Sequence, residues 1–171
     1  MNVKGRLSIL ALACLTVPLF ATESEGPTEE LQQLGSLIGK VWVGEFPGGT
    51  MTDEQRFEWI FEGKFLRNTH RVIDAEGKVT YEGETIFAWH PAGQTLVWWY
   101  FNVTGGFITG TIAESDEGWE FEGINHSPPP QPPRVRGLWK IVSEDEWRST
   151  QYFYDSGEWK ETFTITFRPK E

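Results

Sequence analysis

The sequence predicts an all-β protein: a ten-stranded up-and-down antiparallel barrel preceded by a short N-terminal helix. Three observations support this fold class. Ten runs of alternating apolar and polar residues fill positions 41–170. Turns that contain glycine, such as Glu62-Gly63-Lys64 and Asp155-Ser156-Gly157, separate these runs, as antiparallel hairpins require. No helix-length stretch interrupts the series, so one closed sheet is expected.

The expected elements follow one another with short connections. Thr28 is a good N-cap, and Leu31, Leu34 and Ile38 have helical spacing, so a short amphipathic helix is expected to cover one end of the sheet. The expected strands span residues 41–46, 55–61, 65–73, 79–89, 96–103, 107–113, 119–125, 135–142, 147–154 and 159–168. The proline-rich segment 127–133 is too stiff for a tight hairpin and is interpreted as a spacer or as a lid beside one mouth.

The beginning of the chain has the layout of a secretory signal peptide. Lys4 and Arg6 precede an apolar stretch over residues 7–21, which is shorter than the roughly 20 residues of a membrane span. Residues 1–21 are therefore predicted to be a signal peptide, 22–36 a linker with the short capping helix, and 37–171 the barrel domain. The protein is expected to be exported, either to a periplasm or outside the cell. Cys14 is the only cysteine, so the mature chain can form no disulfide.

Charge restricts the possible partners. Removal of residues 1–21 leaves 13 basic and 25 acidic residues, a net charge of −12. Nucleic acids and anionic membrane surfaces repel such a chain, so neither is an expected partner. The acidity fits the solubility of an exported protein.

Polar residues on predicted inward faces point to a cavity. Asn102, Asn125, Ser149 and Gln151 alternate with aromatic residues, and buried amides and hydroxyls need hydrogen-bond partners. Water or a polar ligand in a cavity would supply them; alternatively, the two asparagines lie at the rim. The predicted ligand-binding residues are Trp59, Arg67, Arg71, Phe87, Trp98, Tyr100, Asn102, Asn125, Gln151 and Phe163.

The alternation also predicts an inward carboxylate, Glu161, between Trp159 and Phe163. Apolar surroundings disfavour the charged form, so Glu161 is the candidate general acid or base. The alternative is a structural ion pair with Arg67 or Arg71. Strand 65–73 does not declare its inner side, because His70 alternates with the arginines and either face brings a cationic or titratable group inward.

Strand 96–103 is apolar on both faces. One face would line the barrel, so Val97, Trp99 and Phe101 on the other face need a cover. A homodimer through these residues is one explanation; cover by the N-terminal helix or the proline-rich loop is the other. The three histidines lack the short spacing of metal ligands, so no metal and no cofactor are expected.

The order of elements resembles the lipocalin-like (calycin) superfamily. Within it, Gly63-Lys64-Phe65-Leu66-Arg67 and Tyr81-Glu82-Gly83-Glu84-Thr85 are similar to a bacterial exported family of unknown function. Nitrobindin-type haem barrels are a more distant likeness, with a Gly-x-Trp-x-Gly start and a late histidine that ligates iron. This chain has two residues between Gly39 and Trp42 and no histidine after His126, so haem binding is not expected.

Three functions remain open from the sequence. The first is an exported lipocalin-like protein that binds a small hydrophobic or aromatic molecule in the barrel lumen. The second is a cofactor-independent isomerase, cyclase or lyase that uses Glu161 for proton transfer. The third is an interaction protein with a filled barrel, which predicts no cavity of ligand size.

Overall fold

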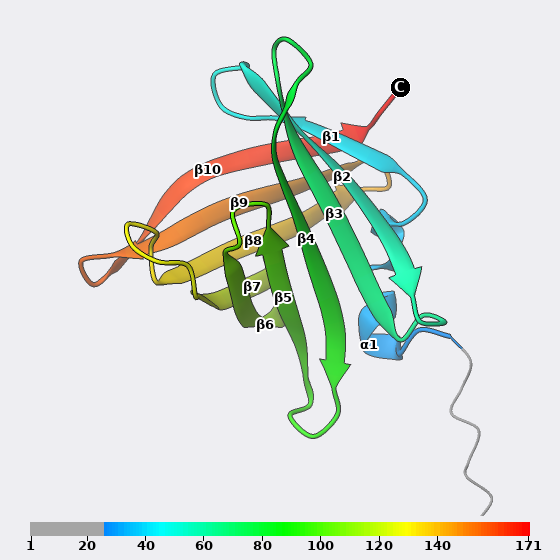
Figure 1. Cartoon of the computed structure of the whole chain (residues 1–171). Helices are drawn as coiled ribbons and strands as arrows, with labels where there is room; N and C mark the ends of the chain where they lie inside the picture. Colours follow the sequence, from blue (N-terminus) through cyan, green and yellow to red (C-terminus); the bar gives the residue numbers. More distant parts are fainter. Residues whose placement is uncertain (1–25) are drawn as a thin grey trace, which may run out of the picture.

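Alternation along the chain produces a closed barrel of ten antiparallel strands in the computed structural model, which describes residues 26–171 (Figure 1). The predicted fold class is confirmed; the predicted signal peptide lies outside the described residues. The strands are β1 Val41–Glu45, β2 Met51–Ile60, β3 Phe65–Asp74, β4 Val79–His90, β5 Thr95–Asn102, β6 Phe107–Ser115, β7 Gly118–Asn125, β8 Arg134–Ser143, β9 Glu146–Asp155 and β10 Glu158–Pro169. Each pairs with its neighbours in sequence, and β1 pairs with β10 to close the ring.

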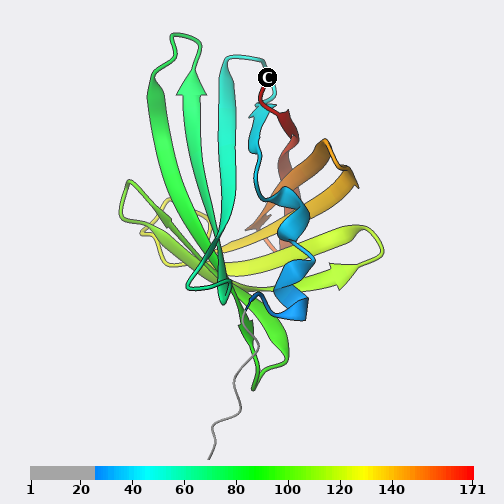
Figure 2. The same cartoon turned by 90° about the vertical axis from the view of Figure 1, so that its right-hand side faces the viewer.

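A helical segment covers one end of the barrel, as the leucine spacing predicts. It consists of α1 Glu29–Gln32 and the 3-10 helix η1 Gly35–Leu37, and Figure 2 shows it across that end. Leu31, Leu34 and Leu37 are at most 1% exposed and belong to the hydrophobic core. The indole Nε1 of Trp42 donates a hydrogen bond of 2.7 Å to the carbonyl oxygen of Leu37 and ties this segment to β1.

Aromatic side chains fill the helix-covered half of the barrel. Trp147 stacks on Phe167 with ring centroids 4.2 Å apart, and Trp139 packs 5.0 Å from Trp147. Phe57 meets both tryptophans edge to face. Such contacts add to the hydrophobic stabilisation of this half.

One irregularity in β10 reverses the faces that alternation predicts for the start of that strand. Glu161 pairs with Tyr152 while Phe163 pairs with Gln151, so Thr162 is the extra residue of a β-bulge. The bulge resets the alternation. Phe163 therefore lines the interior, whereas Glu161 is exposed and accepts a hydrogen bond of 3.2 Å from Thr164 Oγ1. The predicted inward orientation of Glu161 is wrong, and neither Arg67 nor Arg71 pairs with it.

A buried carboxylate on the outer face joins β2 to β3 and to the C-terminus. The Glu54 side chain is 2% exposed and accepts hydrogen bonds from Lys170 at 2.6 Å, Arg71 at 2.6 Å and Arg56 at 3.1 Å. The hydrogen bond from Lys170, with help from Arg71 and Arg56 and against the effect of burial, lowers the pKa of Glu54 to about 2.

This shift predicts a loss of stability in acid. The folded pKa lies below the usual value of 4.5, so the stabilisation is present above that value and is lost as the pH falls toward about 2. We expect Glu54→Gln to lower the free energy of unfolding by about 2 kcal/mol at neutral pH, a figure discounted for the exposed cations. Urea denaturation between pH 7 and pH 2 measures it.

The matched control is Glu58→Gln on the same outer face, where an exposed carboxylate pairs with Arg67. Its expected cost is about 0.5 kcal/mol. If the Glu54→Gln protein kept the same dependence of stability on pH as the unmodified chain, the assignment of the acid loss to Glu54 would be wrong.

Candidate functional site

The interior of the barrel contains a cavity of about 1230 Å³, which reaches Trp139 and Phe167 of the aromatic core. Its mouth lies opposite α1, bordered by the β5–β6 loop at Thr104–Gly106 and by the proline-rich segment, whose residues 128–133 form part of the wall. The segment therefore lines the mouth, whether as a lid or as a spacer. The apolar lining consists mainly of Phe46, Phe87, Trp98, Ile108, Phe121, Val135, Trp139, Phe163, Ile165 and Phe167.

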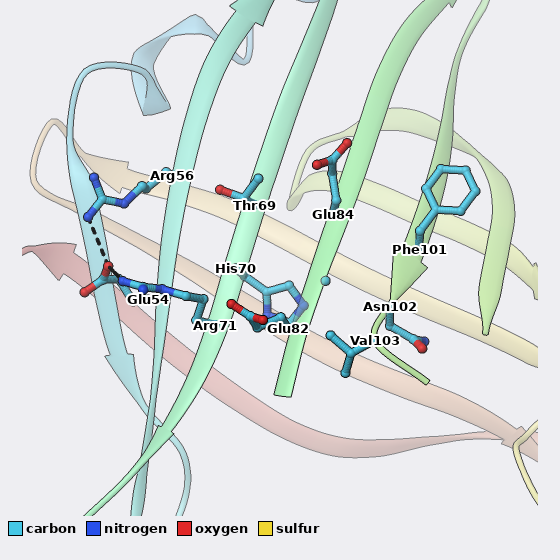
Figure 3. A pocket seen from close by; sticks show the side chains of 11 residues that line it. Glu54, Arg56, Thr69, His70, Arg71, Glu82, Glu84, Phe101, Asn102 and Val103 are labelled. Atoms are coloured by element: carbon cyan, nitrogen blue, oxygen red, sulfur yellow. Dashed lines mark hydrogen bonds and ion pairs between the residues drawn. The ribbon is translucent and has the colours of Figure 1, made fainter. Parts of the chain in front are cut away.

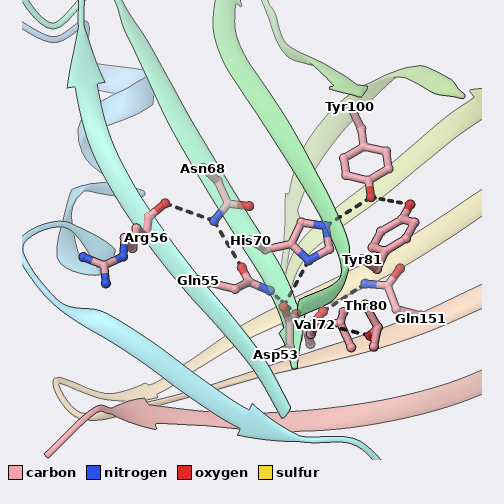
Figure 4. A network of polar contacts seen from close by, with 11 residues as sticks. Asp53, Gln55, Arg56, Asn68, His70, Val72, Thr80, Tyr81, Tyr100 and Gln151 are labelled. Atoms are coloured by element: carbon pink, nitrogen blue, oxygen red, sulfur yellow. Dashed lines mark hydrogen bonds and ion pairs between the residues drawn. The ribbon is translucent and has the colours of Figure 1, made fainter. Parts of the chain in front are cut away.

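A connected set of polar side chains forms the opposite wall, on β2 and β3 (Figure 4). Asn68 Nδ2 donates to Gln55 Oε1 at 3.2 Å, and Gln55 Nε2 donates to Asp53 Oδ2 at 2.8 Å. The other oxygen of Asp53 lies 3.0 Å from His70 Nδ1. Asp53, Gln55 and Asn68 are less than 9% exposed, so the wall is buried and its polar groups satisfy one another.

Two tyrosines continue this wall across β5 and β4. His70 Nε2 lies 3.1 Å from Tyr100 Oη, and Tyr100 Oη donates a hydrogen bond of 2.7 Å to Tyr81 Oη. Burial, together with the Tyr81 hydroxyl and the Asp53 charge, raises the pKa of Tyr100 far above its usual value. Tyr100 therefore stays protonated and acts as a hydrogen-bond donor. We call Asp53, His70, Tyr100 and Tyr81 the relay.

A glycine makes the centre of the relay possible. Gly83 on β4 lies opposite His70 on β3 and opposite Asn102 on β5. A Cβ atom at this position would lie 2.5 Å from Tyr100 Oη and 2.6 Å from His70 Nε2. The space that a side chain would fill is thus the space in which histidine and tyrosine meet, and only glycine fits there without displacing them.

The structure settles which face of β3 is inward. Asn68, His70 and Val72 line the cavity, Leu66 is buried on the same side, and the arginines face outward. Arg67 pairs with Glu58 and Arg71 pairs with Glu54 on the outer surface. Placing Arg67 and Arg71 in the lumen is therefore wrong, because each has a carboxylate partner on the neighbouring strand outside.

Most of the other predicted ligand-binding residues line the cavity. They are Phe87, Trp98, Tyr100, Asn102, Asn125, Gln151 and Phe163. Their contact with a ligand stays a prediction. Trp59 does not line the cavity. It packs at the helix-covered end, where its ring would lie 3.6 Å from a Cβ atom placed on Gly35.

The two predicted asparagines lie at the rim, as the alternative interpretation holds. Asn102 Oδ1 accepts hydrogen bonds from the backbone N–H groups of Thr104 and Gly106, at 3.0 and 3.1 Å. Asn125 Oδ1 accepts one of 3.0 Å from the N–H of Ser127. Both side chains shape the loops of the mouth.

Sequence reasoning missed the acidic end of the relay. Asp53 precedes the expected strand 55–61, so the alternation of that strand could not predict that its side chain points inward. Gln55 shares the parity of Phe57 and was open to detection as an inward polar residue. Tyr81 lies within the expected strand 79–89, but nothing in the spacing links it to Tyr100.

A second depression, of about 790 Å³, lies on the outer surface over β2–β5 (Figure 3). Its polar residues include Glu54, whose carboxylate forms ion pairs with both Arg56 and Arg71. Phe101 and Val103 form its apolar edge. The Glu54 carboxylate is thus occupied by its ion pairs with Arg56 and Arg71.

The outer apolar face of β5 stays exposed in residues 26–171. Trp99, Phe101 and Val103 are 36%, 47% and 59% exposed. Neither α1 at the barrel end nor the proline-rich segment at the mouth covers them, so cover by those two segments is wrong. The homodimer through Val97, Trp99 and Phe101 stays a prediction.

Residues 26–171 contain neither a cluster of metal ligands nor a membrane-spanning helix. No group of three or more histidine, cysteine or acidic side chains is placed to hold a metal ion in this range. Over the same residues, the helices are too short and too polar to cross a bilayer.

The fold and the site together define a class: a closed ten-stranded antiparallel barrel with an internal cavity. Among solved structures, the chain is similar to the crystal structure of Rv2717c from M. tuberculosis, with a TM-score of 0.61 and 16% sequence identity over 85% of this chain and 99% of that chain. This likeness shows the fold. No protein-family model matches the sequence. No curated protein matches it either.

Proposed function

We propose that the protein binds a small, largely hydrophobic or aromatic molecule inside the barrel, in the manner of an exported lipocalin-like carrier. The observation that carries the proposal is the cavity of about 1230 Å³, with an aromatic wall and a hydrogen-bonded polar wall facing each other. Ligand sites of small barrels have this composition, mostly apolar with a few placed polar groups.

The resemblance of the turn and strand motifs to lipocalin-like proteins supports the proposal, and so does the expected export. The filled-barrel alternative predicts no cavity of ligand size, which disagrees with the interior described above. The enzyme alternative loses its stated residue, because Glu161 is exposed on the outer face. Binding is therefore favoured over both.

The test blocks the cavity with a tryptophan. Gln151 lines the cavity from β9, and a Trp side chain there would fill much of the space near Ser149. We expect Gln151→Trp to weaken binding of the hydrophobic dye anilinonaphthalene sulfonate by about tenfold or more, measured by fluorescence titration.

The control is Thr150→Trp, one residue away on the opposite face, where Thr150 bonds to Thr164 outside the barrel. This variant should bind the dye as the unmodified chain does. Equal weakening by both substitutions, or by neither, would show that the dye does not enter the barrel. Native mass spectrometry of protein purified from its own host then identifies any ligand that it carries.

A further inference from the structure

The direction of the hydrogen bonds in the polar wall is fixed at its acidic end. Asp53 accepts from Gln55 Nε2 on one oxygen, and Gln55 is itself oriented by Asn68 Nδ2. A carboxylate that accepts on this side faces His70 Nδ1 with its other oxygen at 3.0 Å. His70 Nδ1 therefore donates to Asp53.

The direction is also fixed at the tyrosine end. Tyr100 has one hydroxyl hydrogen and donates it to Tyr81. The 3.1 Å contact between Tyr100 Oη and His70 Nε2 holds the Tyr100 hydroxyl beside the imidazole ring.

At this end of the wall, the hydrogen bond therefore points from Tyr100 to Tyr81. In residues 26–171 the Tyr81 hydroxyl makes only the hydrogen bond that it accepts from Tyr100. Its own hydrogen remains for an occupant of the cavity that Tyr81 lines. A hydroxyl that accepts one hydrogen bond is a stronger donor in the next, so the hydrogen bond from Tyr100 strengthens Tyr81 toward an anionic acceptor.

We infer that the polar wall is an oxyanion site: Tyr81, supported by Tyr100, His70 and Asp53, takes the oxygen of a phenolate or an enolate. The inference rests on the proposed function, and it names the class of ligand. The negative end of the relay, Asp53, is covered by His70 and Gln55, so the anion meets donors and not the carboxylate.

The rest of the cavity suits the body of such a ligand. Phe87, Trp98 and Phe121 pack edge to face along the apolar wall. A planar aromatic or conjugated ring finds stacking and edge contacts there, while its oxygen reaches the tyrosines. A neutral hydrocarbon of the same shape would use the apolar wall and leave the Tyr81 hydroxyl unpaired, which costs affinity.

The test compares para-nitrophenol with nitrobenzene, which has the same ring and nitro group but no hydroxyl. Absorbance distinguishes nitrophenol from nitrophenolate, so one titration gives both the affinity and the ionisation of the bound ligand. We expect the purified protein to bind nitrophenolate about tenfold more tightly than nitrobenzene and to lower the pH at which the bound phenol ionises.

Tyr81→Phe removes the donor and keeps the ring. It should lower nitrophenolate affinity by about tenfold and abolish the shift in ionisation, while nitrobenzene affinity changes by less than about twofold. Gly83→Ala, which pushes Tyr100 and His70 apart, should reduce the same preference although Tyr81 is intact. Thr150→Val is the control, because the Thr150 hydroxyl bonds to Thr164 on the outer face; it should leave both affinities unchanged.

The outcomes separate the two proposals. Equal affinity for nitrophenolate and nitrobenzene, with no shift in ionisation, would overturn the oxyanion site and leave binding in the cavity standing. An unchanged preference in Tyr81→Phe would overturn the role of Tyr81. Failure of the protein to bind either probe or the dye would overturn both the oxyanion site and the proposed function. Thermal denaturation of each variant confirms that the protein is folded.

Discussion

Replacement of Trp147 by alanine is expected to lower the free energy of unfolding by about 4 kcal/mol. The side chain is 0% exposed and lies at the centre of the aromatic core, stacked on Phe167 and packed against Trp139, Phe57 and Trp42. Truncation removes an indole that five strands share and leaves a hole that the neighbouring rings fill only in part. Urea denaturation followed by circular dichroism measures the change.

Trp147→Phe is the matched variant. The indole Nε1 of Trp147 is buried without a hydrogen-bond partner in residues 26–171, so phenylalanine removes an unsatisfied donor while it keeps the stacked ring. Its expected cost is about 1 kcal/mol. As a surface control, Trp159→Ala, whose ring packs against Tyr154 near the tip of the β9–β10 hairpin, should cost much less than Trp147→Ala. A small loss in Trp147→Ala would mean that the aromatic core does not hold the barrel together.

Replacement of Asp53 by alanine is expected to lower the free energy of unfolding by about 3 kcal/mol, because it removes the carboxylate that accepts two buried hydrogen bonds. Asp53 is 5% exposed, and its two oxygens accept from His70 and Gln55. Both of these side chains would lose their acceptor in a wall that excludes most water. The measurement is again the free energy of unfolding from urea denaturation, at neutral pH.

A double-mutant cycle separates the pair from the loss of a single group. His70→Leu should lower the free energy of unfolding less in the Asp53→Ala background than in the unmodified chain. In the unmodified chain, loss of His70 also leaves the Asp53 carboxylate without this hydrogen-bond partner. If the losses of unfolding free energy were additive, Asp53 and His70 would not interact. The orientation of His70 in the relay would then not depend on Asp53. Glu58→Ala, at an exposed carboxylate on the same strand, is the control.

The closed sheet was predictable because both of its signals are local. Turn glycines and period-two alternation act over a few residues, and the barrel needs little more than their repetition. The predicted orientation of a side chain is wrong where the pairing of two strands interrupts the alternation. Glu161 has the parity of an inward residue, but one extra residue at Thr162 moves it outside. A bulge depends on how β9 and β10 twist against each other, which no single strand encodes.

The candidate site was predictable in part for the same reason. Most residues of its aromatic wall lie on strands whose alternation is clean, and they are where the sequence puts them. The relay is different, because four side chains from four strands meet through hydrogen bonds. Arg67 and His70 both suit a polar interior, and the choice between their faces depends on carboxylates of β2 such as Glu58 and Asp53.

The pairing of β1 with β10 has a consequence for folding and for binding. Every other pairing of the barrel joins neighbours in sequence, whereas this seam joins the two ends of the sheet over the short register from Trp42–Pro169 to Gly44–Phe167. Its formation carries the largest loss of chain entropy, so the seam is the natural last step of folding and the first place of local opening. It also brings Phe46 against Phe163, with centroids 5.3 Å apart, and so completes the wall of the cavity. A ligand that needs the complete wall binds the closed barrel better than a sheet in which β1 and β10 have separated. Its binding free energy therefore stabilises the pairing of β1 with β10.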